Sequence, residues 1–177
     1  VNADHLLAQS PDAMGLFGER DALVIVDRYS EYVDAFPLKS KTAKDALWAF
    51  NEYFGTDSPV DVYVWSDSAH ELTSAVKSLG LPHGRGTPGR HTANGHCERW
   101  IRKIVDGTRS LLEHAGLPSC YWTFAIRHWC FAHNTELRDG DSPWNKRHGL
   151  GQFPYPVLPF GCTVDFLDKP EEVKGLP

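Results

Sequence analysis

The sequence predicts a mixed α/β fold in which helices cover a central β-sheet. Residues 1–38 contain three β-like runs, and residues 43–54 then change to a helical repeat. A fourth β-like run follows at residues 60–66, and two long helical segments at residues 95–115 and 119–134 complete the pattern. Strands that alternate with helices in this order are typical of helices packed against one mixed sheet.

The first strands are identified by their apolar runs. Residues 1–8 form a short apolar stretch, and residues 10–19 have the Gly and Pro content of a turn. Residues 22–26 are a continuous run dominated by β-branched side chains, which is typical of a strand covered on both faces. Residues 32–38 follow closely enough to be the third strand of a meander, with Pro37 near its end.

The next two elements are a helix and a strand. Apolar residues recur at helical spacing over residues 43–54, where Thr42 is placed to cap the start and Gly55 follows the end. Valines at 60, 62 and 64 alternate with more polar or aromatic residues, which predicts a fourth strand running into Asp67.

The second half is predicted to be mainly helical. A short helix over residues 72–79 leads into a loop at 80–95 that is rich in Gly and Pro. Residues 95–115 then form a long amphipathic helix, and residues 119–134 form a helix that is apolar nearly all round and hence buried.

Length and composition indicate a globular protein. The chain has 177 residues, of which 41% are hydrophobic and 23% charged, with a net charge of −5. We expect a core domain over residues 1–136 and a loop-rich C-terminal extension over residues 137–177, with one strand at 160–167. A start without Met and a Pro/Gly-rich tail favour a piece of a longer protein.

The sequence favours a nuclear or cytoplasmic location. It has no apolar run of membrane-spanning length and no signal segment, so we expect a soluble protein that does not enter membranes. The cysteines form no CxxC pair and have no zinc-site spacing, and they are expected to stay reduced: Cys97, Cys120, Cys130 and Cys162.

Three carboxylates in separate elements are candidate metal ligands. Asp4 lies in the first strand, Asp67 ends the fourth strand, and Glu98 lies in the first turn of the long helix. Carboxylate oxygens suit Mg²⁺ or Mn²⁺. Spacing alone leaves other roles open, because strand-end aspartates often shape turns. Glu98 and Arg102 also have the order favoured for a helix ion pair, which contributes about 0.2–0.5 kcal/mol.

Several motifs resemble retroviral and retrotransposon integrases. Residues 65–72, Trp-Ser-Asp-Ser-Ala-His-Glu-Leu, resemble the second-aspartate motif of that family, and residues 86–99 resemble its loop and helix bearing the final glutamate. Residues 23–37 are similar to its second and third strands, and residues 2–5 fall where it carries the first aspartate. Residues 142–162 are similar to the segment that follows the core in copia-type retrotransposons.

The resemblance implies a ribonuclease-H-like fold, with a five-stranded mixed sheet flanked by helices. It implies a polynucleotidyl transferase that trims element DNA ends and joins them to target DNA, with two Mg²⁺ or Mn²⁺ ions held by Asp4, Asp67 and Glu98. Asp27 competes with Asp4 for the role of first acid. The order of the motifs favours Asp4 and leaves Asp27 as a structural residue at a strand end.

DNA is the expected partner although the chain is acidic, because basic residues gather near Glu98. The residues expected to contact DNA are Arg85, Arg90, Asn94, Arg99, Arg102 and Arg109. A solvated helix face is the alternative explanation of this cluster. Joining two DNA ends together implies a homo-oligomer, for which the helix at 119–134 and the helix before it offer apolar surface.

Two other functions remain open on the sequence. A related transposase or nuclease with the same fold would use the same acids. A domesticated, catalytically silent module that binds nucleic acid or protein would not need them. Ser68 and Ala69 stand where the family commonly has asparagine and glycine, which keeps the silent module open.

Overall fold

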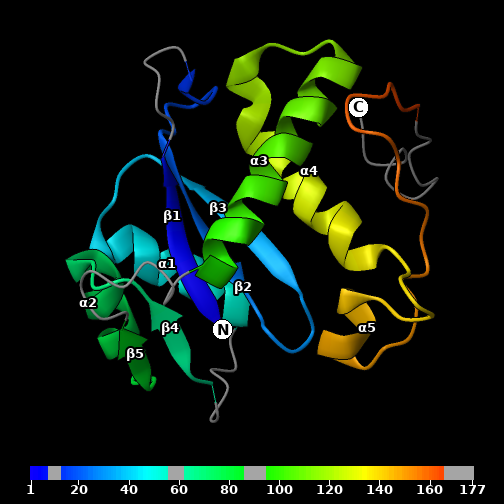
Figure 1. Cartoon of the computed structure of the whole chain (residues 1–177). Coiled ribbons are helices and arrows are strands. Elements are labelled where there is room, and N and C mark those ends of the chain that lie inside the picture. Colours follow the sequence, from blue (N-terminus) through cyan, green and yellow to red (C-terminus); the bar gives the residue numbers. More distant parts are fainter. Residues whose placement is uncertain (8–12, 56–61, 86–94, 166–177) are drawn as a thin grey trace, which may run out of the picture.

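A five-stranded mixed sheet forms the centre of the molecule (Figure 1). The computed structural model describes residues 1–7, 13–55, 62–85 and 95–165. In chain order the strands are β1 (Asn2–Leu7), β2 (Asp21–Val26), β3 (Val33–Leu38), β4 (Val64–Ser66) and β5 (His83–Arg85). Their order in the sheet is β3-β2-β1-β4-β5, with antiparallel pairs among β1, β2 and β3 and parallel pairs joining β1, β4 and β5. The predicted α/β fold is therefore confirmed.

Helices cover both faces of this sheet (Figure 1). One face packs against α1 (Ala43–Phe54) and α2 (His70–Ser78). The other packs against α3 (Gly95–Ala115) and α4 (Trp122–Thr135), which follows the 3₁₀ turn Ser119–Tyr121. The short α5 (Pro143–His148) packs beside α4. Within the described ranges, every helix is too short or too polar to cross a membrane.

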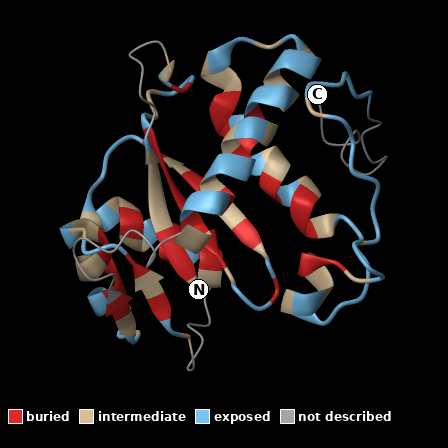
Figure 2. Cartoon of the chain, viewed as in Figure 1, coloured by how far each residue is buried: buried red, intermediate tan, exposed pale blue. Residues whose placement is uncertain are grey.

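The strand β2 lies between two hydrophobic cores, as its unbroken apolar run predicts. All six of its residues are buried (Figure 2). Leu23 and Ile25 belong to the core under α1 and α2, while Val24 and Val26 belong to the core under α3 and α4. Successive side chains point to opposite faces of a strand, so a strand covered on both sides is apolar at consecutive positions, as residues 22–26 are.

The edge strand β3 is fixed by a side chain from α4. Asn134 Oδ1 accepts a hydrogen bond from the Val33 N–H at 3.0 Å, and Asn134 Nδ2 donates to the Val33 carbonyl at 2.8 Å. Pro37 lies opposite Ala22 in this strand. Its missing N–H is tolerated because β3 has a neighbour on one side only.

The bounds predicted for the helix at 43–54 are confirmed. Thr42 caps its first turn by accepting a hydrogen bond from the Asp45 N–H at 3.2 Å. Gly55 ends it with a φ of 78°, and its N–H donates to the Asn51 carbonyl at 2.8 Å. A left-handed φ of this kind favours glycine.

Two strand predictions need correction. The fourth strand covers only residues 64–66; Val62 and Tyr63 precede it, and residue 60 lies outside the described ranges. The fifth strand is at residues 83–85, inside the segment predicted as a loop. Three residues centred on a glycine have no alternating apolar pattern, and this strand exists because it pairs with β4.

Two predictions for the C-terminal third also differ from the structure. Residues 160–165 form no strand, and the regular element of this region is α5, which Ser142 caps by accepting from the Asn145 N–H. The helix α4 is not buried all round, because Phe124 and Phe131 are 45% and 38% exposed. The presence of aromatic side chains all round α4 therefore does not indicate that every side of this helix is buried.

We predict that Gly107→Ala destabilises the protein. A Cβ at this position would lie 1.8 Å from Trp129 Nε1, because α3 and α4 approach closely there. Alanine in a helix interior is ordinarily better than glycine by about 0.5–1 kcal/mol. Here the clash should instead lower the free energy of unfolding by about 1–3 kcal/mol in urea titrations. Ser110→Ala, on the exposed side of the same helix, is the control. A Gly107→Ala variant as stable as wild type would contradict the close approach.

Candidate active site

The parallel pairing of β1 with β4 brings two of the candidate acids together. Asn2 is the register partner of Trp65, and Asp4 and Asp67 each lie two residues further along in the same direction. Alternate residues of a strand share a face. Asp4 therefore points to the same side as Leu6, which belongs to the core under α3 and α4.

Asp67 lies where the chain leaves β4 and turns toward α2. Its Oδ1 accepts a hydrogen bond from the Ala69 N–H at 3.1 Å, and its carbonyl accepts one from the Ser66 hydroxyl at 2.8 Å. The residue is exposed. Asp67 therefore shapes a turn, as the conservative interpretation of the sequence expects, while its carboxylate stays accessible from solvent.

Glu98 is presented by the first turn of α3. The helix is anchored to the sheet by its buried residues Cys97, Trp100 and Ile104, while Glu98 itself is exposed. Because these buried residues face the sheet, the Glu98 side chain lies outside the contact between α3 and the sheet and is accessible to solvent. Packing of α3 on β1 and β2 places its first turn near Asp4.

The three carboxylates share one electrostatic environment. Burial raises the pKa of Asp4 to about 6, and the negative charges of Asp67 and Glu98 act in the same direction. The His5 N–H opposes this shift by donating to Asp4 Oδ1 at 2.8 Å. The pKa of the Cys97 thiol is raised by burial and by the same three acids. Asp67 and Glu98 therefore lie near enough to Asp4 for their charges to affect it.

The chemistry of these residues fits a divalent cation, although the acids are not gathered into a finished ligand set. In the described ranges, no three His, Cys, Asp or Glu side chains are grouped closely enough to hold a metal ion. Carboxylate oxygens are nevertheless the ligands that Mg²⁺ prefers. The repulsion that Asp4 experiences from Asp67 and Glu98 is also of the kind that a bound cation relieves.

Asp27, the competing first acid, is engaged in the turn between β2 and β3. Its Oδ2 accepts hydrogen bonds from the Ser30 N–H at 3.0 Å and from the Ser30 hydroxyl at 2.6 Å. Burial acts to raise the pKa of Asp27, but these hydrogen bonds outweigh it and hold the pKa below its ordinary value. This geometry fits a structural residue at a strand end.

The basic side chains of α3 lie on its exposed side, near Glu98. Arg102 lies one helical turn after Glu98 and is exposed, and no ion pair joins the two in the described part of the chain. Arg99 Nε donates to the Gly95 carbonyl at 3.2 Å, and Lys103 Nζ lies 4.7 Å from the centre of the Trp100 ring. Arg102 is therefore the cation of this group best placed to contact a phosphate near the acids.

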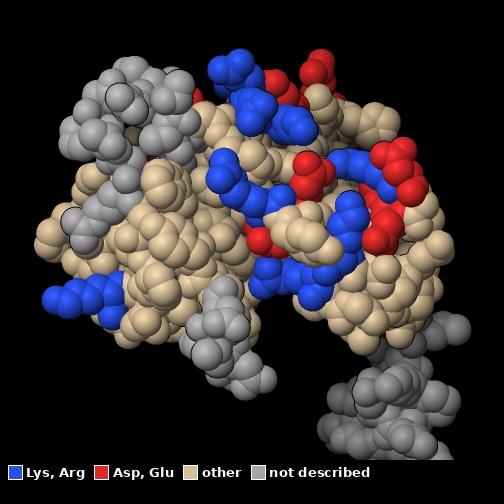
Figure 3. Space-filling model, turned by 60° about the horizontal axis from the view of Figure 1, so that its bottom comes forward, with Lys and Arg blue, Asp and Glu red and all other residues tan. Residues whose placement is uncertain are grey.

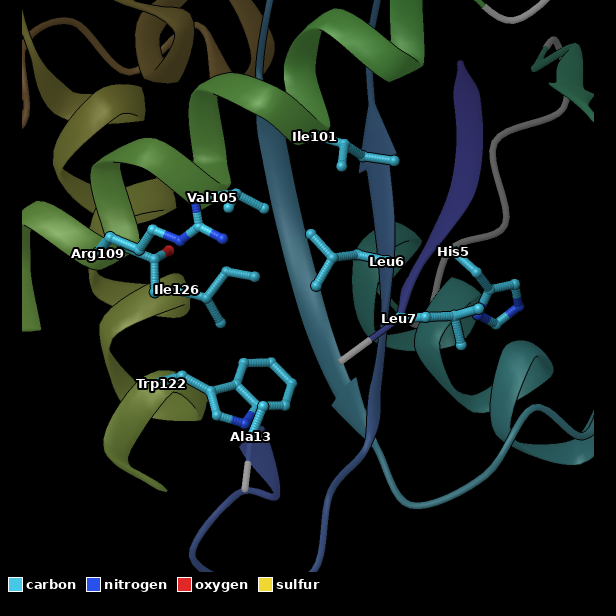
Figure 4. A pocket seen from close by; sticks show the side chains of 10 residues that line it. His5, Leu6, Leu7, Ala13, Ile101, Val105, Arg109, Trp122 and Ile126 are labelled. Carbon is cyan, nitrogen blue, oxygen red and sulfur yellow. The ribbon is translucent and has the colours of Figure 1, made fainter. Parts of the chain in front are cut away.

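The remaining predicted DNA contacts are spread more widely. Arg109 lines an apolar cavity of about 500 Å³ between β1, α3 and α4 (Figure 4). It lies roughly 16 Å along the helix from Glu98. Arg85 ends β5. Arg90 and Asn94 lie outside the described residues. On the face seen in Figure 3, Lys and Arg side chains surround a small acidic group and do not form one continuous basic surface.

One feature of this face was missed by the sequence interpretation. Tyr63 and Trp65 precede Asp67 at alternate positions, and their rings stack with centroids 6.4 Å apart. By itself this alternation predicts only a strand. Tyr63 and Trp65 precede Asp67 by even numbers of positions, so they are expected on the same face of the strand as Asp67, opposite the buried Val64. This spacing could have identified the aromatic pair from the sequence.

Comparison with known proteins supports the resemblance to retroelements. The chain is 28% identical over 149 residues to the retrovirus-related Pol polyprotein from transposon RE2 of Arabidopsis thaliana, and 27% identical over 149 residues to that from transposon RE1. Each match covers 80% of this chain and 10% of the relative, so the chain spans about a tenth of these polyproteins. The polyprotein from transposon TNT 1-94 of Nicotiana tabacum is 36% identical over 74 residues, which is 39% of this chain and 6% of that one.

The fold is similar to that of a retroviral integrase core. The crystal structure of the catalytic core domain of BIV integrase matches with a TM-score of 0.56 at 17% identity, covering 81% of this chain and 90% of that one. No family model matches the sequence. The predicted ribonuclease-H-like, five-stranded fold and the resemblance to retrotransposon and retroviral integrase cores are thus confirmed.

We predict that Asp4→Asn stabilises the metal-free protein at alkaline pH. The pKa of Asp4 is about 6 in the folded state against 3.8 ordinarily, so wild-type stability falls as pH rises through this interval. The variant should gain about 1–3 kcal/mol of unfolding free energy at pH 8, and the gain should vanish toward pH 4. Urea unfolding in EDTA at both pH values measures it.

The matched control for this prediction is Asp27→Asn, which should change the free energy of unfolding at pH 8 in the opposite direction. The folded-state pKa of Asp27 is lowered, so its contribution to stability is present above its ordinary pKa and is lost as pH falls. The control variant should therefore be less stable than wild type at pH 8. Equal effects of the two substitutions would show that the environment of Asp4 is not the one described.

Proposed function

We propose that this chain is the catalytic core of a retroelement integrase, which processes element DNA ends and joins them to target DNA. The observation that carries the proposal is that Asp4 in β1 is aligned with Asp67 after β4, and that the charges of Asp67 and of Glu98 in the first turn of α3 both act on Asp4. The similarity to retrotransposon Pol polyproteins supports it. The activity assigned is that of a polynucleotidyl transferase.

In this proposal the three acids hold two divalent cations, Mg²⁺ or Mn²⁺. Bound cations would supply the positive charge that neutralises the scissile phosphate and activates the attacking oxygen. The chain's own contribution is positional. The sheet register would set Asp4 beside Asp67, and the packing of α3 on the sheet would hold Glu98 near them. No His or Lys is assigned as a general base, because none is required for this chemistry.

The proposed partners are DNA and a second copy of the chain. Arg102 would contact a phosphate next to the acids, since it is exposed and lies one turn from Glu98. Coordinated joining of two DNA ends needs two active centres, so the proposal includes a homodimer. The exposed Phe124 and Phe131 of α4 offer apolar surface for it. Such an enzyme would act inside the cell, in the nucleus or cytoplasm.

We predict that strand transfer depends on each member of the triad. Asp4→Asn, Asp67→Asn and Glu98→Gln should each reduce Mg²⁺- or Mn²⁺-dependent joining of a labelled DNA end to background, because each removes a metal ligand. Circular dichroism should show the fold retained. Asp27→Asn is the control and should keep its activity, since Ser30 already engages that carboxylate.

The same assay separates the alternatives. Full activity in any triad variant would remove that residue from the site. A wild-type protein that binds DNA but joins none, with binding unchanged by Asp67→Asn, would establish a silent binding module in place of the enzyme. Cleavage without joining would favour a related nuclease.

We predict that Arg102→Ala weakens DNA binding without affecting stability. Loss of one phosphate contact should lower the slope of log Kd against log salt concentration by about one. The free energy of unfolding should change by less than about 0.5 kcal/mol, because Arg102 is exposed and not paired with Glu98. Lys77→Ala on α2, at the opposite face of the sheet, is the control and should leave the slope unchanged. Lost stability with unaltered affinity would assign Arg102 a purely structural role.

A further inference from the structure

We propose that Tyr63 and Trp65 form a stacking site for an unpaired nucleobase of the DNA strand that occupies the acidic site. This inference rests on the proposed function and adds a substrate contact to it. We define the two side chains, with Gly84 beneath them, as the aromatic platform. Trp65 lies in β4, Tyr63 directly precedes that strand, and Asp67 directly follows it.

Strand register places the aromatic platform in line with the acids. Tyr63, Trp65 and Asp67 occupy alternate positions, while the intervening Val64 is buried in the core under α1 and α2. The three side chains therefore share the opposite face, where Asp4 also lies. A two-residue step along a strand is about 6.6 Å, so the Trp65 ring starts one such step from Asp67.

The two rings are held against the sheet by a glycine of the neighbouring strand. Gly84 is the register partner of Trp65. A Cβ at Gly84 would lie 2.4 Å from Trp65 Cε3 and 2.5 Å from Tyr63 Oη, so both rings lie directly over its backbone. The interplanar angle between the rings is 30°. The absence of a side chain at Gly84 thus lets the rings lie together in a stacked arrangement before any ligand arrives.

The platform lies on the part of the sheet beyond α3. The helices α3 and α4 pack against β1, β2 and β3, and β4 and β5 extend the sheet past them (Figure 1). Tyr63 is 52% exposed, although its ring lies over the backbone of Gly84. An aromatic ring of this kind offers its face to a ligand.

The chemistry of the site favours a nucleobase that has left the duplex. Bases in a duplex have their faces covered by neighbouring base pairs, whereas an unpaired base has a face free to stack on an aromatic side chain. Such stacking depends little on base identity, because every base has an aromatic face. Tyr63 lies two two-residue strand steps, about 13 Å, from Asp67. A DNA strand whose phosphate lies at Asp4 and Asp67 would therefore bring a base one or two nucleotides further along over the Tyr63 ring. The platform therefore recognises frayed or single-stranded DNA ends and not duplex DNA.

The test compares two DNA duplexes that differ only at one end. One is blunt, and the other carries a short unpaired overhang containing 2-aminopurine, whose fluorescence falls on stacking. Affinity is measured by fluorescence anisotropy in Ca²⁺ for wild type, Tyr63→Ala, Tyr63→Phe and Gly84→Ala. Tyr155→Ala, which removes an exposed tyrosine from the C-terminal extension, is the control.

We expect Tyr63→Ala to weaken binding of the overhang duplex about tenfold and to restore 2-aminopurine fluorescence. Binding of the blunt duplex should change less than about twofold on the same scale. Tyr63→Phe and Tyr155→Ala should bind the overhang duplex with wild-type affinity. Gly84→Ala displaces the rings without removing them, so its affinity should lie between those of wild type and Tyr63→Ala. Thermal melting confirms that each variant is folded.

If Tyr63→Ala lost the same affinity for both duplexes, or lost affinity for neither, the aromatic platform would be overturned. The outcome is separable from that of the proposed function. A wild-type protein that joins DNA strands yet shows no dependence on Tyr63 refutes the platform alone. A wild-type protein that binds neither duplex refutes the integrase proposal, and the platform with it.

Discussion

The parallel register between β1 and β4 is the constraint on which the candidate site depends. Asn2 pairs with Trp65, and this single alignment sets Asp4 beside Asp67 on one face of the sheet. A slip of one residue would turn Asp4 into the opposite core, because side chains alternate along a strand. The slip is prevented by the antiparallel register of β1 with the fully buried β2, which extends from Asn2 to Leu7.

The third acid depends on how α3 lies across the sheet. Cys97, Trp100 and Ile104 are buried against β1 and β2, and the close approach of Gly107 to Trp129 fixes the helix against α4. With its core-facing side fixed, the first turn leaves Glu98 exposed near Asp4. Burial of Asp4 raises its pKa, and the charges of the two other carboxylates act in the same direction.

Local patterns predicted much of the fold. The run at residues 22–26 has apolar side chains on both faces, and the helix at 43–54 carries its own cap and terminating glycine, so each is specified by adjacent residues. The strand at 83–85 could not be predicted in this way, because it is defined by pairing with β4 and not by its own side chains. The strand predicted at 160–167 was wrong over the described residues 160–165, since a short apolar run does not specify a strand partner.

Spacing in the sequence alone could not predict that Asp4 lies near Asp67. Their proximity depends on a strand pair distant in sequence, and only the resemblance to integrases predicted it.

In the proposed function, Asp4, Asp67 and Glu98 together form a divalent-metal centre. Anomalous diffraction from crystals grown with Mn²⁺ tests it most directly, because manganese scatters anomalously and can be located without reference to any assumed ligand. We expect manganese peaks bounded by these three carboxylates in wild-type crystals, and their loss in crystals of Asp67→Asn. Manganese bound instead at Asp27, or no manganese near Asp4 and Asp67 at millimolar concentration, would contradict it.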